Sequence, residues 1–425
     1  MLDLKFVRQN ADVVRDGAIK KHISCDVDRV IELDQEVRVL KTESEAKKAE
    51  QNKVTKSIPS LQGDDKTSAI QAMKALGKEQ KSIDSDVKAK EEELRRLLLT
   101  LPNPPAPEVP EGKDDLENVE IRKEGELPTF DFEMRDHLEL GRMHDMLDFE
   151  RAARIAGSRT YFLKNAGALL EFSILRMALD HMVAKGFSPM IVPNLVRREA
   201  MEGTAYFPGG EDQAYRTERD DLFLIGTAEV PLTSYRGGEI LEKSELPTKM
   251  VGWSNCYRRE AGAAGRDTRG LYRIHQFQKI EQVILCEGDE EVSKKFHDEI
   301  LRNSEEVLQM LELPYRVVNV CGGDLGSGQV QKYDIETWMP SRESYSETHS
   351  ASRFHDFQAR RLGLRYRDDD GKVKFCHTLN NTVIASPRAL IPLIENHQKA
   401  DGSIYIPEAL RPYMGGVSEL APKMK

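Results

Sequence analysis

The 425-residue sequence predicts an α+β protein in two parts: a long antiparallel helical coiled-coil arm, followed by a domain built on a mainly antiparallel β-sheet flanked by helices. Three observations predict this arrangement. Residues 26–101 carry apolar side chains three and four positions apart, which is the spacing of a helical stripe. Residues 102–107 include four prolines, which end that stripe. Beyond residue 150, β-rich and helical segments alternate without the regular order of a parallel sheet.

Composition excludes several classes of protein. Hydrophobic residues make up 39% of the chain and charged residues 32%, and 62 Lys and Arg against 72 Asp and Glu leave a formal charge of −10. These values are typical of a folded globular chain, and they exclude a disordered chain, a membrane protein and a uniformly basic protein that coats nucleic acid. The five cysteines are scattered without a CxxC pair, and the N-terminus does not resemble a signal peptide. We therefore expect a cytoplasmic protein.

The first element is a predicted two-helix arm within a domain of residues 1–101. Two apolar stripes define its helices, and their residues are Val30, Leu33, Val37 and Leu40, then Met73, Leu76, Ile83, Val87, Leu94, Leu97 and Leu101. Pro59 and a polar turn at Gly63-Asp64-Asp65 separate the stripes, so the two helices are expected to run antiparallel. A helix of about 30 residues would extend for about 45 Å.

The outer half of the arm is basic although the protein is acidic. Residues 41–90 hold 11 Lys and Arg against 8 Asp and Glu, which favours contact with the phosphates of a nucleic acid. The candidate lysines are Lys47, Lys48, Lys53, Lys56, Lys74, Lys78 and Lys81. The pattern alone also fits a two-helix piece of a bundle or an oligomerisation coiled coil.

Two further regions follow the arm. Residues 102–150 are predicted as a proline-rich and acidic linker region, since residues 101–150 hold 15 Asp and Glu against 5 Lys and Arg. Residues 151–425 are predicted as the sheet domain. Its expected helix covers residues 168–185, and its expected strands cover residues 190–192, 221–225, 249–257, 277–285, 315–320, 333–338, 364–366 and 373–379.

The densest set of chemically active residues lies between positions 257 and 281. Tyr257-Arg258-Arg259-Glu260 ends one predicted strand, and Phe277 and Glu281, four apart, share one face of the next. The planar guanidinium of arginine suits a phosphate, and an aromatic ring suits a stacked base. A surface hairpin held by salt bridges is the alternative interpretation.

A second set, residues 378–388, joins a strand to a helix through small residues. Arg388 stands where the helix of residues 389–396 is expected to begin, and both an arginine and a helix N-terminus favour an anion. For this segment alone, a capped helix with a surface arginine is the alternative. The chain has no GxxxxGK[ST] motif, which excludes a P-loop nucleotide site, and it has neither HExxH nor GxSxG.

These segments resemble the three motifs of class II aminoacyl-tRNA synthetases, and among those enzymes the seryl-tRNA synthetases. Residues 185–193 resemble the first motif, residues 258–281 the second, and residues 380–388 the third. Gly226-Thr227-Ala228-Glu229, residues 345–350 and residues 356–361 are also similar to the seryl enzymes. Because the arm and the proline linker match the layout of the family, the resemblance covers essentially the whole chain.

The resemblance implies a role for each matching position. It implies two catalytic arginines, Arg258 and Arg388, and a Mg²⁺ site at Glu347 and Ser350. The ATP-binding positions are Arg258, Arg259, Glu260, Ile274, Phe277, Glu347, Thr348, His349, Ser350 and Arg388. The serine-binding positions are Thr227, Ala228, Glu229, Arg258, Glu281 and Thr382.

The resemblance also implies an activity and partners. Such an enzyme activates L-serine with ATP to seryl-adenylate and transfers serine to the 3′ end of tRNA(Ser), and of tRNA(Sec) as well. The first motif implies a homodimer, and the arm implies a grip on the long variable arm of the tRNA. The chain departs from many relatives at Asn381-Thr382, where they carry Gly-Ser, but it keeps the hydroxyl.

Two rival functions belong to other classes. A ligase that loads an amino acid onto a carrier protein would resemble the sheet domain and lack the arm, so residues 26–101 count against it. A non-catalytic scaffold derived from a synthetase would be expected to lose Arg258, Glu281 or Arg388, and all three are present.

Overall fold

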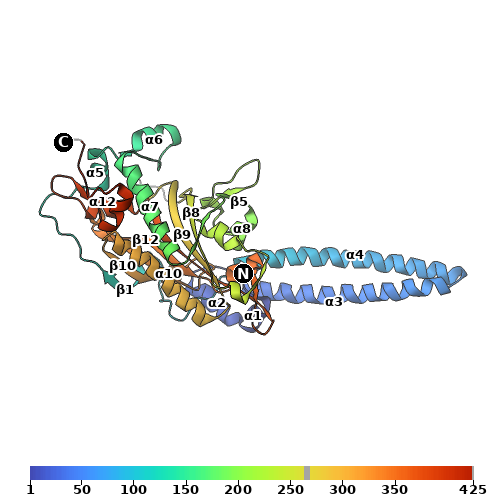
Figure 1. The fold of residues 1–425 in the computed structure, drawn as a ribbon. Helices are drawn as coiled ribbons and strands as arrows, with labels where there is room; N and C mark the ends of the chain where they lie inside the picture. The colour runs from blue at the N-terminus through green and yellow to red at the C-terminus, as the bar shows by residue number, and fades with distance from the viewer. Residues whose placement is uncertain (263–268, 424–425) are drawn as a thin grey trace. The chain divides into compact units, whose positions relative to one another are not determined.

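The computed structural model describes residues 1–262 and 269–423, and it divides into two compact units, Met1–Pro104 and Pro105–Lys425 (Figure 1). Residues 263–268, in the loop of the predicted hairpin, lie outside the described residues. Among the residues that are described, no helix is long and apolar enough to cross a membrane.

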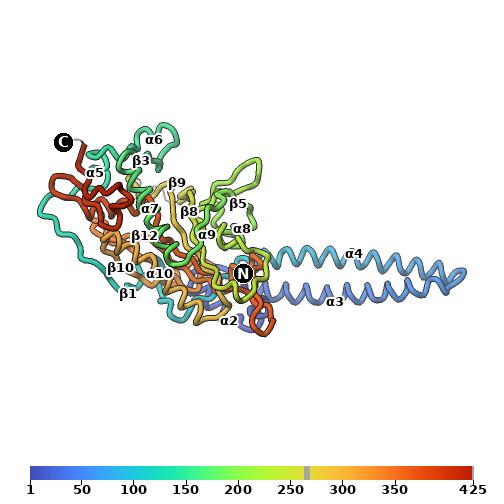
Figure 2. Tube along the Cα trace, in the orientation of Figure 1, coloured from blue at the N-terminus to red at the C-terminus, as the bar shows by residue number. Residues whose placement is uncertain are grey.

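The first unit contains the predicted helical arm, in which α3 and α4 lie side by side (Figure 2). Its elements are α1 (Leu4–Gln9), α2 (Ala11–Lys20), α3 (Val27–Ser57), η1 (Ile58–Ser60) and α4 (Gly63–Thr100). The predicted turn at Gly63-Asp64-Asp65 is wrong, because the chain reverses through η1, which contains Pro59. Asp64 and Asp65 instead lie in the first turn of α4, where acidic side chains favour the positive end of the helix dipole.

Ion pairs accompany the apolar stripe along the arm. Lys90 contacts Glu36 at 2.6 Å, Lys41 contacts Glu91 at 2.6 Å, and Lys47 pairs with Glu79. Each exposed pair contributes at most about 1 kcal/mol, so they fix the pairing of α3 with α4 more than they stabilise it.

The second unit is built on an eight-stranded sheet in the order β1-β10-β11-β12-β15-β9-β8-β4, antiparallel except between β4 and β8. Its strands are β1 (Val119–Glu124), β4 (Ser188–Ile191), β8 (Thr248–Tyr257), β9 (Gln276–Cys286), β10 (Tyr315–Asn319), β11 (Gln331–Met339), β12 (Ser344–Arg353) and β15 (His377–Ser386). Short strands form small separate sheets: β2 (Leu147–Asp148), β3 (Phe162–Leu163), β5 (Leu195–Val196), β6 (Phe223–Leu224), β7 (Ile240–Glu242), β13 (Arg365–Arg367), β14 (Val373–Phe375), β16 (Ile404–Tyr405) and β17 (Glu419–Leu420).

Helices cover one face of this sheet and one end of the other face. They are α5 (His137–Met143), α6 (Phe149–Ala156), α7 (Ala166–Ala184), α8 (Arg198–Gly203), α9 (Glu229–Ser234), α10 (Glu290–Met310), α11 (Phe357–Leu362) and α12 (Leu390–Asn396), with 3₁₀ turns η2 (Asp115–Glu117), η3 (Glu211–Gln213), η4 (Lys243–Glu245), η5 (Gly322–Asp324), η6 (Pro340–Arg342) and η7 (Glu408–Met414). Figure 1 shows α7 and α10 against the sheet, where they bury Val251, Ile284 and Val383 in the main core. On the other face, α9 packs over Met250 and Val283 in a second core, and the rest of that face stays polar.

The structure confirms the α+β class and most predicted strands, and three of its differences from the prediction concern the main sheet and its surroundings. Residues 373–379 form two strands, β14 and the start of β15, instead of one. The central strand β12 is missing from the prediction, because Ser344–Arg353 is mostly polar and lacks an apolar alternation. Residues 102–150, predicted as a linker region, supply β1 at an edge of the sheet, as well as α5 and β2.

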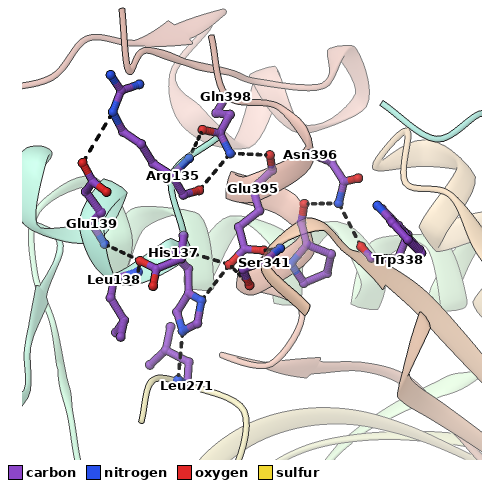
Figure 3. A network of polar contacts seen from close by, with 12 residues as sticks. Arg135, His137, Leu138, Glu139, Leu271, Trp338, Ser341, Glu395, Asn396 and Gln398 are labelled. Atoms are coloured by element: carbon purple, nitrogen blue, oxygen red, sulfur yellow. Dashed lines mark hydrogen bonds and ion pairs between the residues drawn. The ribbon is translucent and has the colours of Figure 1, made fainter. Parts of the chain in front are cut away.

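A buried carboxylate ties α12 to three other segments (Figure 3). Glu395 is fully buried and accepts hydrogen bonds from the backbone N–H of His137 at 2.9 Å and from the Ser341 hydroxyl and N–H at 2.8 and 3.0 Å. His137 Nδ1 lies 2.8 Å from the same carboxylate, and its Nε2 accepts from the Leu271 N–H at 3.3 Å. Glu395 therefore joins α5, η6, α12 and the segment that precedes β9.

We expect Glu395→Ala to lower the stability of the second unit by about 3 kcal/mol or more, because it leaves several buried donors without an acceptor. Thermal or urea unfolding measures this loss. The matched variant Glu408→Ala removes an exposed carboxylate and should unfold like the wild type. Equal stability of the two variants would contradict the assigned role of Glu395.

Candidate active site

The polar face of the sheet holds a cleft of about 500 Å³. It is lined by Arg258, Glu260, Leu271, Tyr272, Ile274, Phe277, Lys279, Glu347, Thr348, Thr382, Ala385, Ser386, Pro387 and Arg388. These residues come from both predicted sets and from β12, which the sequence pattern did not predict as a strand.

Two β-bulges place these side chains on one face. In β12, Ser350 faces Asp334 and Glu347 faces Glu336, so Thr348 between them is an extra residue. Residues three apart normally point to opposite faces, and the extra residue brings Glu347 and Ser350 to the same face. The same device recurs in β15, where the extra residue Val383 lets Thr382 and Ala385 share a face.

Strand β9 provides the floor of the cleft. Phe277, Lys279 and Glu281 alternate along it, and Glu281 lies opposite Thr382 in β15 and Gly252 in β8. A Cβ at Gly252 would stand 3.0 Å from Leu232 Cδ1 and 3.2 Å from Ala228 Cβ. Glycine at this position therefore lets the segment that carries Glu229 approach β9 closely.

Arg258 lies at the centre of the cleft, immediately after β8. Its backbone N–H donates to the His275 carbonyl at 2.9 Å, and His275 Nδ1 lies 3.0 Å from the Arg258 carbonyl. Its guanidinium donates to the Gly226 carbonyl at 3.4 Å and lies 5.2 Å from the centre of the Phe277 ring. The backbone contacts fix the hairpin, so the guanidinium is held between the two ends of the cleft.

One end of the cleft is rich in cations and aromatic rings. Arg388 donates to the carbonyls of Glu347 at 3.0 Å and Tyr272 at 3.2 Å, and its guanidinium lies 4.4 Å from the centre of the Tyr272 ring. Glu260 pairs with Arg273 at 2.8 Å. This end suits a nucleotide, because it offers a planar ring at Phe277 and two guanidinium groups.

The other end holds two buried carboxylates. Glu281 contacts Lys279 Nζ at 2.5 Å and accepts a hydrogen bond from the Thr382 hydroxyl at 3.3 Å. Glu229 accepts from the Tyr206 hydroxyl at 2.9 Å and from Gln358 Nε2 at 2.8 Å. Burial, reinforced by the nearby Glu281, raises the pKa of Glu229 to about 7. Two carboxylates beside one lysine suit a ligand that carries an ammonium group.

Several predicted residues lie away from the floor of the cleft. Arg259 is exposed and donates to the Asp212 carbonyl at 3.3 Å. His349 is buried, and its Nε2 lies 3.1 Å from the Val383 carbonyl. Thr227 and Ala228 are buried at the start of α9, where Thr227 Oγ1 accepts from the Glu229 N–H at 3.2 Å. The contacts of Thr227 and Ala228 therefore position Glu229.

The two residues predicted to hold Mg²⁺ have an acidic neighbour, Asp334. Asp334 lies opposite Ser350 on the neighbouring strand β11. Asp334 is 5% exposed, and its Oδ1 has no hydrogen-bond partner among the described residues, although Lys332 Nζ lies 3.4 Å from its Oδ2. Carboxylate and hydroxyl oxygens are ligands that Mg²⁺ accepts, so this donor set fits the ion. The sequence pattern did not indicate Asp334, because its neighbourhood depends on pairing between strands.

A second cleft of about 920 Å³ opens beside the first and shares Arg258 and Glu260 with it. Tyr206, Gln213 and Arg273 also line it. The two clefts therefore meet at the central arginine.

Comparisons with known proteins agree across the chain. Residues 1–105 match the family "Seryl-tRNA synthetase N-terminal domain", and residues 213–397 match the "tRNA synthetase class II core domain (G, H, P, S and T)". The chain is 50% identical over 416 residues to the serine–tRNA ligase of Deinococcus radiodurans, with 98% of each chain covered, and 44% identical to that of Dictyoglomus turgidum over the whole of both chains. A crystal structure of seryl-tRNA synthetase from Pyrococcus horikoshii complexed with ATP superposes with a TM-score of 0.92 at 38% identity, covering 99% of this chain and 100% of that one.

The raised pKa of Glu229 predicts a pH-dependent stability. An unfolded glutamate loses its proton near pH 4.5, whereas Glu229 in the folded protein keeps its proton up to about pH 7. The folded state therefore loses about 3 kcal/mol of stability as the pH rises through this window. We expect Glu229→Gln, which cannot ionise, to gain Tm relative to the wild type between pH 5 and pH 8.

The control for this measurement is Glu218→Gln, at an exposed carboxylate. Its Tm should follow the wild-type curve at every pH. If the Glu229→Gln curve also runs parallel to the wild type, then burial does not hold a proton on Glu229.

Proposed function

The chain belongs to the seryl-tRNA synthetase family and is a serine–tRNA ligase that charges tRNA(Ser), and from this premise we propose that the cleft around Arg258 is where serine and ATP react. One observation carries the proposal: a single guanidinium stands between a nucleotide-like end and a pair of buried carboxylates. Phe277, Glu260 and Arg388 are assigned to ATP, and Glu229, Glu281 and Thr382 to serine.

The proposed reaction needs positioning more than proton transfer. The carboxylate of serine is already an anion and attacks the α-phosphorus of ATP without a general base. Two anions must be held in line while negative charge develops on the phosphate oxygens. We propose that Arg258, which lines the cleft, contacts both anions and that Arg388 adds a second positive group at the nucleotide end.

Glu347 and Ser350 are proposed to hold Mg²⁺, with Asp334 beside them. When bound, this ion supplies positive charge to the phosphates and to the pyrophosphate that leaves. Among the described residues, no group of three or more His, Cys, Asp or Glu side chains is arranged to hold a metal, so ATP and water are expected to complete the coordination.

The second step transfers serine to a terminal ribose hydroxyl of the tRNA. We place the 3′ end of the tRNA in the second cleft, because that cleft is also lined by Arg258 and so adjoins the proposed place of the adenylate. A site that hydrogen-bonds the serine hydroxyl is expected to reject alanine by roughly 10⁴-fold, which makes a separate editing domain unnecessary.

We propose a homodimer formed through α7 and β4. Apolar side chains are exposed there, with 57% of Leu169, 54% of Phe172 and 95% of Ile191 accessible, and β4 is a terminal strand of the sheet. Exposed apolar groups of this size on an edge strand and its neighbouring helix favour an interface. The free thiols of all five cysteines support activity in the cytoplasm.

The helical arm is proposed to bind the tRNA by its shape and phosphates. Six of the seven candidate lysines are exposed, whereas Lys47 is half-buried and paired with Glu79. Recognition by shape and phosphates does not depend on the anticodon, so we expect tRNA(Sec) to be a second substrate. The match of residues 1–105 to the seryl N-terminal domain disfavours a carrier-protein ligase.

We expect Arg258→Gln to slow serine-dependent exchange of pyrophosphate into ATP by about 10²- to 10³-fold, because it removes charge from the reacting phosphate. The matched variant Arg236→Gln breaks surface ion pairs with Glu239 and Glu245 and should exchange at the wild-type rate. An unchanged rate in a folded Arg258→Gln protein would exclude Arg258 from the activation step.

Replacing Lys48, Lys53, Lys56, Lys74, Lys78 and Lys81 by alanine should weaken tRNA(Ser) binding and flatten its salt dependence. For each phosphate that a lysine no longer neutralises, the slope of log K against log salt concentration should shrink by about 0.7 to 0.9. Lys47→Ala is the internal control, since Glu79 already neutralises this lysine. A salt slope that is equal in the six-lysine variant and the wild type rules out this surface.

A further inference from the structure

Lys279 is a buried cation to which neither the motifs nor the proposed reaction gives a role. Its side chain is almost wholly inaccessible, and Nζ lies 2.5 Å from Glu281 Oε2 and 3.3 Å from Thr382 Oγ1. The Thr382 hydroxyl in turn donates to Glu281 Oε2 at 3.3 Å. Lys279, Glu281 and Thr382 therefore form a closed triangle at the end of the cleft assigned to serine.

Glu229, the second carboxylate, is held differently. Among the described residues, its side-chain hydrogen bonds come from neutral groups, the Tyr206 hydroxyl at 2.9 Å and Gln358 Nε2 at 2.8 Å. Gln358 is itself fixed, because its Oε1 accepts from the Thr378 hydroxyl at 2.6 Å. Glu229 is thus positioned without a bonded cation, whereas Glu281 already has one.

We propose that Lys279 determines specificity by neutralising Glu281, which reserves Glu281 and Thr382 for the serine hydroxyl and leaves Glu229 to pair with the serine ammonium group. This inference rests on the proposed function of the cleft. A zwitterionic ligand then meets Glu229, whose described hydrogen bonds include no cation, with its ammonium group, and Arg258 with its carboxylate.

The hydrogen-bond directions support this division of roles. Lys279 can only donate, so Thr382 accepts from it and uses its own proton for Glu281. Among the described residues, Lys279 and Thr382 both contact Glu281 through Oε2, so Oε1 remains an acceptor, and the single proton of a substrate hydroxyl is the matching donor. A methyl group at the same place leaves this acceptor unpaired, which is costly in a buried site.

Other ionisable groups around the triangle come from β8, the residue that follows it, α9 and β12. Arg258 follows β8, Cys256 lies on β8, Glu229 starts α9 and Glu347 lies on β12. Burial raises the pKa of the Cys256 thiol, so it stays neutral. Without Lys279, Glu281 would be a buried carboxylate beside Glu229 with no bonded cation, and burial together with the like charge would favour its protonated form.

Two non-hydrolysable probes separate the two roles: the seryl and the alanyl sulfamoyl analogues of the adenylate, which differ by one hydroxyl. Calorimetry gives the ratio of their dissociation constants for each variant. In the wild type we expect the seryl analogue to bind about 100-fold tighter or more, with a ratio that is flat from pH 6 to pH 9.

The variants should then fall into two classes. Glu229→Gln should weaken the binding of both analogues and leave the ratio of dissociation constants unchanged. Glu281→Gln should bring this ratio close to one and change the binding of the alanyl analogue little.

Lys279→Met should bring the ratio close to one at pH 6 and restore it as the pH rises, because Glu281 must lose its proton to accept the hydroxyl. In Lys279→Met/Glu281→Gln, the lysine change should add nothing to the effect of Glu281→Gln.

Lys249→Met is the matched control. Lys249 lies on β8 and pairs with Glu299 of α10 at 2.6 Å, away from the cleft, so its loss should leave the ratio flat and unchanged. A Tm measurement verifies that each variant folds. If Lys279→Met alone does not fold, the double variant Lys279→Met/Glu281→Gln still tests the proposal.

Three results overturn the proposal: a ratio in Lys279→Met that stays at the wild-type value, a collapsed ratio that is independent of pH, or equal weakening of both analogues by Glu281→Gln. Failure of the wild type to bind either analogue is a different outcome, which refutes the proposed function of the cleft instead.

Discussion

The constraint on which this site depends is the alternation of side chains along antiparallel strands, and two extra residues that interrupt it. Without the bulge at Thr348, Glu347 and Ser350 would point to opposite faces. Without the bulge at Val383, Thr382 and Ala385 would also point to opposite faces. With both bulges in place, one face of the sheet is polar from β11 to β8, while the other packs against α7 and α10. The chemistry can therefore change on one face without disturbing the apolar core on the other.

Each end of the cleft has its own support. At the serine end, Gly252 has no side chain, so Ala228 and Leu232 pack against β8 and bring Glu229 near Glu281. At the nucleotide end, the Glu395 network holds Leu271 and Ser341, and their neighbours Tyr272 and Arg342 place a ring and a guanidinium 4.4 Å apart. Arg388 packs on the same ring at 4.4 Å. At the serine end, the buried Glu229 and Glu281 favour a ligand that carries a positive charge.

Sequence patterns were sufficient where structure follows from neighbours in the chain. The arm, β8 and β9 were predicted because their periodicity and turn residues are local. Strand β12 was not, because its polar residues are stabilised as a strand only by pairing with β11 and β15. The same reason explains the site: motif resemblance suggested Arg258, Glu281 and Thr382, but Lys279, Tyr206 and Asp334 gain their contacts through pairing and packing between distant segments. The polar reversal at Gly63 was misplaced by a few residues, since acidic residues stabilise a helix start as readily as a turn.

A crystal structure with the seryl sulfamoyl analogue of the adenylate would show most directly whether a single polar face of the sheet holds both substrates around Arg258. We expect the adenine ring against Phe277, the sulfamoyl group within hydrogen-bond distance of Arg258, and the serine side chain directed at Thr382. An analogue bound elsewhere, or bound with its serine end away from the Glu229 and Glu281 carboxylates, would contradict this arrangement.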